Sequence, residues 1–217
     1  MLTNIKAAIF DLDGTLVDSM WLWLKVDYDF LKLRGLEVPS DLTDAIAHLN
    51  FRDTAEYFKN RFSLKESLEE IMDEWNNMAY FEYANNIKLK ESSKEYLDFL
   101  KAKGLKLGLA TSNHPKLLKA VLENNGIYDY FDAITTTLET KRGKDFPDVY
   151  LLSAEKLGVA PEECIVFEDI IAAIQGAKAA GMKVVGVHDV HSEHQLEDIL
   201  KLADHFIYKY NELIKNV

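Results

Sequence analysis

Short apolar runs that alternate with helical patterns restrict the fold of this chain more than any other feature of its sequence. They span residues 7–10, 105–110, 133–135, 164–167 and 183–187 and are rich in Ile, Val and Leu. Continuous apolar runs of this length suit strands that are buried on both faces of a sheet. Their alternation with helices predicts an α/β fold, in which helices sandwich a Rossmann-like parallel sheet with right-handed crossovers.

The stretch of residues 16–85 follows a different pattern, because it contains no strand-like run and indicates three or four helices. Ser63-Leu-Lys-Glu66 has the sequence of a capping box, a signal for the start of a helix. Apolar residues follow it at helical spacing: Leu64, Leu68, Ile71, Met72, Trp75, Met78 and Ala79. We therefore predict two domains, an α/β core of residues 1–15 and 86–217 and an inserted all-helical cap of residues 16–85.

Charge and composition exclude several classes of partner. The formal net charge is −11, from 25 Lys and Arg against 36 Asp and Glu, and such a field repels nucleic acid and anionic lipid. No apolar run reaches the roughly 18 residues that a membrane-spanning helix needs. The single Cys164 and the absence of a signal-like pattern at residues 1–10 favour a cytoplasmic protein, with a monomer as the default state.

Two acidic pairs follow two of the predicted strands. Asp11 and Asp13 come at the carboxyl end of the first run, and Glu168-Asp169 follows the run of residues 164–167. Open α/β sheets bind ligands outside this edge, and Gly14 permits the chain to turn there. Neighbouring carboxylates beside apolar strands are costly without a cation, and an oxygen-rich site suits Mg²⁺.

Polar groups that suit a phosphate lie near the ends of other predicted elements. The run of residues 105–110 ends in Thr111-Ser112-Asn113, where a hydroxyl and the amides of a helix start favour an anion. Lys144 precedes a predicted helix of residues 148–157 and offers a positive charge to a transferring phosphoryl group. These residues therefore predict a site for phosphate chemistry.

The chain resembles the haloacid dehalogenase superfamily, in the phosphatase and β-phosphoglucomutase-like branch with a helical cap. The resemblance rests on four motifs in order, Asp-x-Asp-Gly-Thr at 11–15, Thr111, Lys144 and Glu-Asp at 168–169. It covers essentially the whole chain. It implies a Mg²⁺-dependent phosphatase that hydrolyses a small phosphorylated metabolite.

The resemblance also implies a role for each residue of the four motifs. Asp11 would attack phosphorus to form an aspartyl-phosphate, and Asp13 would protonate the leaving oxygen and then activate water. Thr111 and Lys144 would stabilise charge on the transferring oxygens.

The implied ligands of the Mg²⁺ ion come from both acidic pairs. They are Asp11, the Leu12–Asp13 segment through a backbone carbonyl, Asp169, and Glu168 through water. The sequence departs from the family pattern after the second pair, where Ile170 replaces a frequent Ser and removes a possible hydroxyl ligand.

Candidate substrate contacts are Ser112, Asn113, Arg52 and Trp23. Arg52 lies in a stretch that relatives use to contact substrate, with a surface role as the alternative. Trp23 occupies the place where the β-phosphoglucomutase pattern has a cap histidine, which favours hydrolysis. Asp18-Ser19 is expected to cap the first cap helix rather than to contact substrate.

Two alternative functions stay open from the sequence. A β-phosphoglucomutase-like sugar phosphomutase would return the phosphoryl group to its substrate. A non-catalytic phospho-switch would share the Asp, Thr and Lys residues, but in such proteins the acidic pair precedes them and no helical insert follows the first strand. The phosphoester itself is not identified by the sequence.

Overall fold

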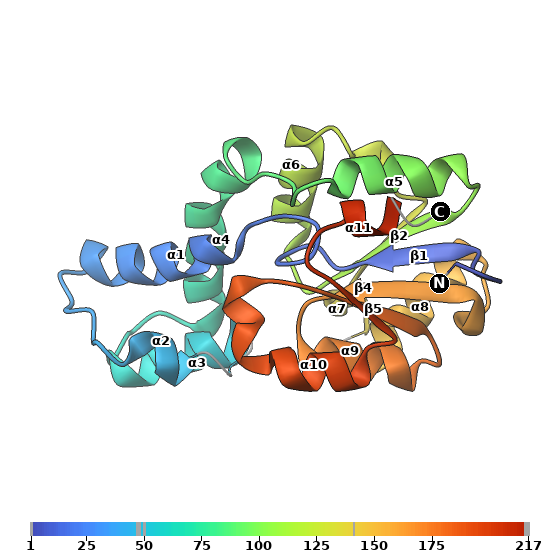
Figure 1. Cartoon of the computed structure of the whole chain (residues 1–217). Helices are drawn as coiled ribbons and strands as arrows, with labels where there is room; N and C mark the ends of the chain where they lie inside the picture. The colour runs from blue at the N-terminus through green and yellow to red at the C-terminus, as the bar shows by residue number, and fades with distance from the viewer. Residues whose placement is uncertain (1, 47–48, 50, 141, 215–217) are drawn as a thin grey trace.

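A six-stranded parallel sheet forms the centre of the molecule (Figure 1). The computed structural model describes residues 2–46, 49, 51–140 and 142–214. The strand order is β3-β2-β1-β4-β5-β6. The strands are β1 (Ala7–Phe10), β2 (Lys106–Thr111), β3 (Ala133–Thr136), β4 (Cys164–Glu168), β5 (Lys183–Val187) and β6 (His205–Ile207). The predicted α/β fold is confirmed, and the five predicted runs match β1–β5 with ends shifted by at most one residue.

Helices cover both faces of the sheet and bury it on both sides. Ala8 and Phe10 of β1 belong to one apolar cluster, and Ala7 and Ile9 belong to the other. The first face is covered by α5 (Ser93–Ala102), α6 (Pro115–Asn124) and α11 (Asn211–Ile214), and the second by α8 (Asp148–Leu157), α9 (Ile171–Ala179) and α10 (Leu196–Leu202). Short helical turns complete the chain: α7 (Thr137–Thr140), η1 (Tyr128–Tyr130), η2 (Pro161–Glu163) and η3 (Val190–Gln195).

The register of β1 with its two neighbours brings three strand ends together. Phe10 pairs with Leu109 of β2 on one side and with Phe167 of β4 on the other. Because the strands are parallel, the residues that follow these pairs emerge at the same edge of the sheet. The polar sequences after β1, β2 and β4 are therefore neighbours in space.

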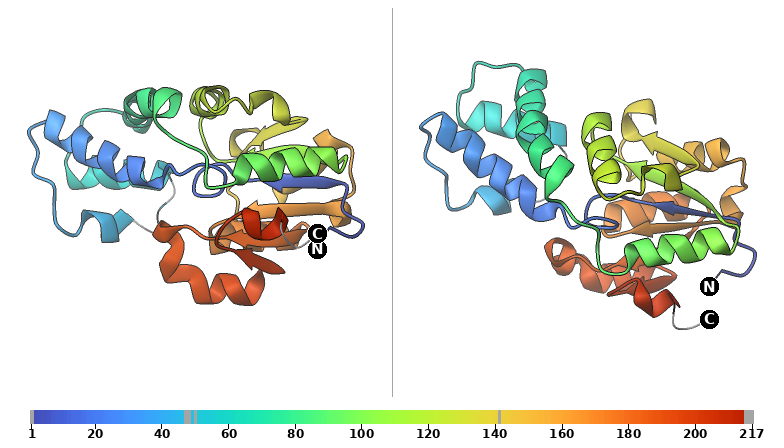
Figure 2. Two further views of the ribbon diagram at one scale, coloured as in Figure 1. Left: turned by 45° about the horizontal axis from the view of Figure 1, so that its top comes forward. Right: turned by 90° about the horizontal axis from the view of Figure 1, so that it is seen from above.

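Four helices between β1 and α5 lie beyond the carboxyl edge of the sheet (Figures 1 and 2). They are α1 (Met20–Leu33), α2 (Leu42–Ile46), α3 (Phe51–Arg61) and α4 (Leu68–Asn85), and we call them the cap helices. Their helical character agrees with the sequence pattern, while the predicted domain boundaries at residues 15 and 85 stay a prediction. None of the helices in the described part of the chain has the length and apolarity needed to cross a bilayer.

The capping box lies four residues later than the sequence analysis placed it. Ser67, not Ser63, accepts from the backbone N–H of Glu70, and the Glu70 side chain accepts from the backbone N–H of Ser67. Ser63 has a φ of 53°, in the left-handed region, so the chain is still turning at that point. Both tetrapeptides match the same pattern, and the turn decides which one begins the helix.

Two chain segments connect the cap helices to the sheet, and they pair with each other. Val17 forms an antiparallel bridge with Leu89. The Asp18 backbone N–H donates to the Lys88 carbonyl at 3.0 Å, and the N–H of Lys90 donates to the carbonyl of Leu16 at 2.8 Å. We call residues 16–18 and 88–90 the linker pair.

Candidate active site

The acidic residues predicted from the sequence gather at the carboxyl edge of the sheet. Asp11, Glu168 and Asp169 are buried, and each offers one carboxylate oxygen, the three oxygens lying within 4.8 Å of one another. The backbone N–H of Asp11 donates to the carbonyl of Phe167 at 3.0 Å, which continues the ladder between β1 and β4 past the end of β1. This hydrogen bond holds the two acidic motifs side by side.

The turn after Asp13 passes directly over Asp169. Gly14 has a φ of 80°, and a Cβ at this position would lie 2.3 Å from the Oδ2 atom of Asp169. Thr15 then donates its hydroxyl to Oδ1 of Asp169 at 3.0 Å. Glycine is therefore required at position 14 for two reasons, the backbone conformation and the close approach of the carboxylate.

The electrostatics of this cluster favour a cation. Burial raises the pKa of Asp169 well above its usual range, and the charges of Asp11 and Glu168 raise it further. Burial also raises the pKa of Glu168 to about 7, against the lowering effect of Lys144. Buried carboxylate oxygens that repel one another are the donor set that a hard divalent cation such as Mg²⁺ takes, so the residues present fit a metal site.

Lys144 joins the cluster from the loop before α8. Its Nζ donates to Oδ1 of Asp11 and, at 2.5 Å, to Oε1 of Glu168. Burial lowers the pKa of Lys144, but the attraction of Asp11 and Glu168 outweighs it and leaves the pKa above its usual value. The ammonium group is therefore charged and held beside the Asp11 carboxylate.

Tyr150 is a member of this network that the sequence analysis did not single out. It lies on α8 and is fully buried, and its hydroxyl donates to Oε1 of Glu168 at 2.8 Å. Glu168 thus accepts hydrogen bonds from both Lys144 and Tyr150. An aromatic residue in an amphipathic helix ordinarily indicates core packing, so nothing in the local sequence distinguishes it.

Asp13 lies apart from the carboxylate cluster and has its own hydrogen-bond partners. Ser19 donates to its Oδ1 at 2.6 Å, Asn113 donates to its Oδ2 at 2.6 Å, and Tyr83 also donates to Oδ1. Burial raises the pKa of Asp13, and the charge of Asp11 adds to this, while the three donors act in the opposite direction. Asp13 is therefore held in place beside Asp11 by three hydrogen-bond donors.

Two of these three donors come from the segment predicted to be the cap. Ser19 stands at the N-cap position of α1, but its side chain makes no capping hydrogen bond and bonds to Asp13 instead, so the expectation that it caps α1 is wrong. Tyr83 lies on α4, is 0% exposed and was not identified from the sequence. In the sequence, Tyr83 has the same helical spacing as other buried residues of α4, so nothing in the pattern distinguishes it.

The three residues after β2 differ in their placement. Thr111 is buried at the strand end, and its hydroxyl oxygen accepts from the backbone N–H of Asn113 at 3.0 Å. Ser112 is exposed, and Asn113 is buried against Asp13. Oδ1 of Asn113 is buried and has no hydrogen-bond partner in the described part of the chain, so it is free to accept one from a ligand.

The two predicted cap contacts have different surroundings. The Trp23 ring lies 6.2 Å from that of Tyr83 and 5.4 Å from that of Phe51, which places Trp23 beside a residue that contacts Asp13. Arg52 is exposed and pairs with Glu69 at 3.1 Å on the surface of the cap helices. The structure therefore brings Trp23 toward the site and holds Arg52 in a surface ion pair.

A buried cluster of carboxylates paired with a lysine, at the carboxyl edge of a parallel sheet, is typical of group-transfer enzymes. A family model described as haloacid dehalogenase-like hydrolase matches residues 8–187. The chain therefore belongs to the haloacid dehalogenase-like hydrolases, and the predicted family and enzyme class are confirmed.

Curated relatives of similar length include phosphatases and a β-phosphoglucomutase of Bacillus subtilis, the latter 31% identical over 211 residues and covering 84% of this chain and 83% of the relative. The chain is 29% identical over 211 residues to the phosphorylated carbohydrates phosphatase of Thermotoga maritima, covering 97% of each chain. It is 30% identical over 198 residues to hexitol phosphatase B of Escherichia coli, covering 85% of this chain and 84% of the relative.

Solved structures agree with the fold. A mutant of CbbY from Rhodobacter sphaeroides in complex with xylulose-(1,5)bisphosphate superimposes with a TM-score of 0.85 over 96% of each chain, at 20% identity. At this level of identity the likeness establishes the common fold alone.

Proposed function

We propose that this chain is a Mg²⁺-dependent phosphatase of small phosphorylated carbohydrates. The observation that carries the proposal is the placement of Lys144 between Asp11 and Glu168, with Asp169 in the same cluster and Asp13 held separately. A nucleophile, its counter-charge and a proton-handling group are then within one site. The relatives that act on phosphorylated carbohydrates and hexitols support the substrate class.

The first half of the proposed reaction transfers the phosphoryl group to Asp11. A carboxylate oxygen of Asp11 bonds to phosphorus, the bond from phosphorus to the substrate oxygen breaks, and Asp13 gives its proton to that oxygen. Lys144 and the hydroxyl group of Thr111 would offset charge on the phosphoryl oxygens. When bound by Asp11, Asp169, the Leu12–Asp13 carbonyl and, through water, Glu168, Mg²⁺ supplies charge neutralisation that lets two anions approach.

The second half removes the phosphoryl group from Asp11. Asp13, now ionised, accepts a proton from water as the water oxygen bonds to phosphorus, and the bond to Asp11 breaks. Ser19, Tyr83 and Asn113 are suited to this step because hydrogen bonds donated to Asp13 stabilise its carboxylate form. The products are inorganic phosphate and the starting form of the enzyme.

The test is a phosphate-release screen with and without Mg²⁺ over hexitol phosphates, aldose and ketose phosphates, phosphoglycolate and nucleoside monophosphates. We expect release from the carbohydrate esters, dependent on Mg²⁺, and a loss of at least about 1,000-fold in Asp11→Asn. Asp18→Asn is the matched control, because Asp18 is exposed and lies outside the carboxylate cluster. An Asp11→Asn protein as active as the control would contradict the proposal, and conversion of β-glucose 1-phosphate without net phosphate release would identify a phosphomutase.

A further inference from the structure

Asp27 is a buried carboxylate that the proposed chemistry does not use. It lies in the middle of α1, is 8% exposed, and has no hydrogen-bond or ion-pair partner in the described part of the chain. Burial raises the pKa of Asp27 to about 7. An apolar residue would fill this position at a lower cost in free energy, so the carboxylate requires another explanation.

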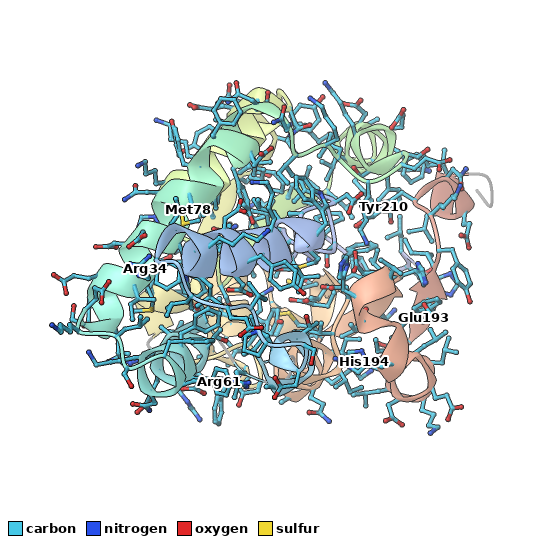
Figure 3. All side chains as sticks on the ribbon, turned by 90° about the vertical axis from the view of Figure 1, so that its left-hand side faces the viewer. Arg34, Arg61, Met78, Glu193, His194 and Tyr210 are labelled. Carbon is cyan, nitrogen blue, oxygen red and sulfur yellow. The ribbon has the colours of Figure 1, made fainter. Side chains whose placement is uncertain are left out.

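The packing of α1 against α4 fixes the surroundings of Asp27. Trp23 contacts Tyr83 at 6.2 Å between ring centroids, and Phe30 contacts Trp75 at 5.5 Å, so the two helices run antiparallel. Asp27 lies between these two contacts on α1, one helical turn or about 5.4 Å from Trp23. On α4, the residue midway between Trp75 and Tyr83 is the buried Ala79, next to Met78, which Figure 3 labels on this helix.

Aromatic rings border this position at both ends. The Phe51 ring lies 5.4 Å from the Trp23 ring and 5.6 Å from the Trp75 ring, and so joins the two contacts that flank Asp27. Phe51 is 38% exposed and Trp23 is only half-buried, so this end of the aromatic group is partly exposed to solvent. Aromatic faces next to a carboxylate combine an apolar surface for C–H groups with an acceptor for hydroxyl groups.

Two further polar groups near this position also lack partners. Nε1 of Trp75 is buried without a hydrogen-bond acceptor, and Asn76 is 9% exposed with no hydrogen bond to the described residues. The indole N–H of Trp75 and the side-chain amide of Asn76 can thus still form hydrogen bonds near the Asp27 carboxylate. Buried polar groups are normally paired, so the unpaired Nε1 of Trp75, near the Asp27 carboxylate, indicates a place that a polar ligand completes.

The same helix faces lead from Asp27 to the reaction centre. Asp27 and Trp23 are one turn apart on α1, Trp23 contacts Tyr83, and Tyr83 donates to Asp13. A substrate whose phosphate lies at Asp11 and whose carbon chain passes Trp23 therefore reaches Asp27 with its distal hydroxyl groups. A short ester without distal hydroxyl groups does not.

We propose that Asp27 is a specificity-determining residue that accepts hydrogen bonds from the distal hydroxyl groups of a phosphorylated polyol or sugar. This proposal rests on the proposed function and names the part of the substrate that the cap helices recognise. A carboxyl group whose burial favours the neutral form suits hydroxyl partners, to which it can both donate and accept, better than it suits a cation.

The experiment compares Asp27→Leu with the unchanged protein on two substrates, sorbitol 6-phosphate and p-nitrophenyl phosphate, both with Mg²⁺. We expect kcat/KM for sorbitol 6-phosphate to fall about 10- to 100-fold, since a hydrogen bond to a carboxylate is lost, and kcat/KM for p-nitrophenyl phosphate to stay within about 2-fold. Asp27→Asn keeps one acceptor oxygen and the original shape, and we expect it to recover part of the activity toward sorbitol 6-phosphate. If Asp27→Leu does not fold, the ratio of kcat/KM for sorbitol 6-phosphate to kcat/KM for p-nitrophenyl phosphate in Asp27→Asn tests the proposal instead.

Several results would overturn this proposal. An equal loss of kcat/KM on both substrates would assign Asp27 a structural role. If the ratio of the two kcat/KM values were unchanged in both variants, Asp27 would not contact the hydroxyl groups. A preference of the unchanged protein for phosphocholine or phosphoethanolamine over polyol phosphates would show that the position takes an ammonium group instead. If the protein releases phosphate from no ester, the proposed phosphatase function is contradicted as well. If the protein is active and the Asp27 variants are unaffected, only the proposed role of Asp27 is contradicted.

Discussion

Gly176 on α9 lies against the loop that carries Lys144. A Cβ at position 176 would lie 2.0 Å from the backbone oxygen of Lys144 and 2.8 Å from that of Phe146. Real Cβ atoms do not approach backbone oxygens so closely, so the loop can take this position only above a glycine. The position of Lys144 thus depends on a residue 32 positions later that lies outside the carboxylate cluster.

Gly176→Ala is expected to displace the Lys144 loop rather than to unfold the protein. Overpacking of this kind costs about 1–3 kcal/mol, and a displaced Lys144 no longer offsets the charge of Asp11 in the transition state. We expect kcat to fall about 10- to 100-fold, while the variant stays folded and loses only a little thermal stability. Gln175→Ala, at an exposed position on the same helix, is the control, and equal activity of the two variants would contradict the prediction.

Tyr150→Phe removes one donor to Glu168 without changing the shape of the core. The Glu168 carboxylate then loses its 2.8 Å hydrogen bond in a buried environment, and such a loss costs about 1–3 kcal/mol. The free energy of unfolding measured in urea should fall by this amount. Tyr128→Phe, at a partly exposed tyrosine, should change it by less than about 0.5 kcal/mol, and a matching loss in both variants would argue against a specific role for Tyr150.

Lys116 on α6 forms a contact between the core and the cap helices. Its Nζ donates to Oδ1 of Asn77 at 3.1 Å and lies 4.6 Å from the centre of the Tyr80 ring, both residues being on α4. An exposed cation–π contact of this kind is worth about 0.5–1 kcal/mol. Lys116→Ala should therefore shift the balance toward an open cap about 2- to 5-fold.

Small-angle scattering in the absence of substrate measures this shift as an increase in the radius of gyration, and KM should rise in parallel. Lys119→Ala on the same helix is the control, because Lys119 pairs with Glu123 within α6 at 3.7 Å and not with the cap helices. A Lys116→Ala protein whose scattering matches that of the control would show that this contact does not hold the cap helices.

Asp27→Asn should change the pH dependence of stability in the absence of substrate. The pKa of Asp27 in the folded protein is about 7, above its ordinary value of 3.8, so the folded state binds this proton more tightly than the unfolded state. The folded state is therefore penalised increasingly as the pH rises from about 4 to about 7, and Asn removes the penalty. Between pH 5 and pH 8 the stability gain of Asp27→Asn over the unchanged protein should grow by about 3 kcal/mol, since the pKa of about 7 lies two pH units above pH 5.

Chemical unfolding at the two pH values measures this gain. Asp73→Asn is the control on α4, since its carboxylate is exposed and should give no such growth. A gain that is the same at pH 5 and pH 8 would mean that Asp27 does not titrate in this range.

The strands were predictable because both faces of each are buried, and continuous apolar runs report that condition directly. The exception is β6, where His205 is exposed and only Ile207 of its three residues is fully buried, so it lacks the run that identifies β1–β5. The start of α4 was misplaced because two consecutive tetrapeptides satisfy one capping pattern, and the left-handed turn at Ser63 shows that the first of them does not begin the helix.

The residues that follow the strands were predictable for a similar reason, since parallel strands carry them to one edge. The gathering of Asp11, Glu168 and Asp169, with Lys144 beside them, follows from that geometry and from the family motifs. The roles of Tyr83 and Tyr150 were not predictable from the sequence. Both side chains reach the site from helices, and the orientation of a helix is set by its packing.

The linker pair ties the handling of protons to the position of the cap. The bridge between Val17 and Leu89 joins the two connections, so neither can lengthen alone. The cap helices can therefore swing only if both segments of the linker pair move together. Such a swing would carry Tyr83 and the start of α1 away from Asp13, leaving Asn113 as the one donor from the core side. Under the proposed function, an open route for substrate and an Asp13 that keeps all three donors would then be mutually exclusive states of one molecule.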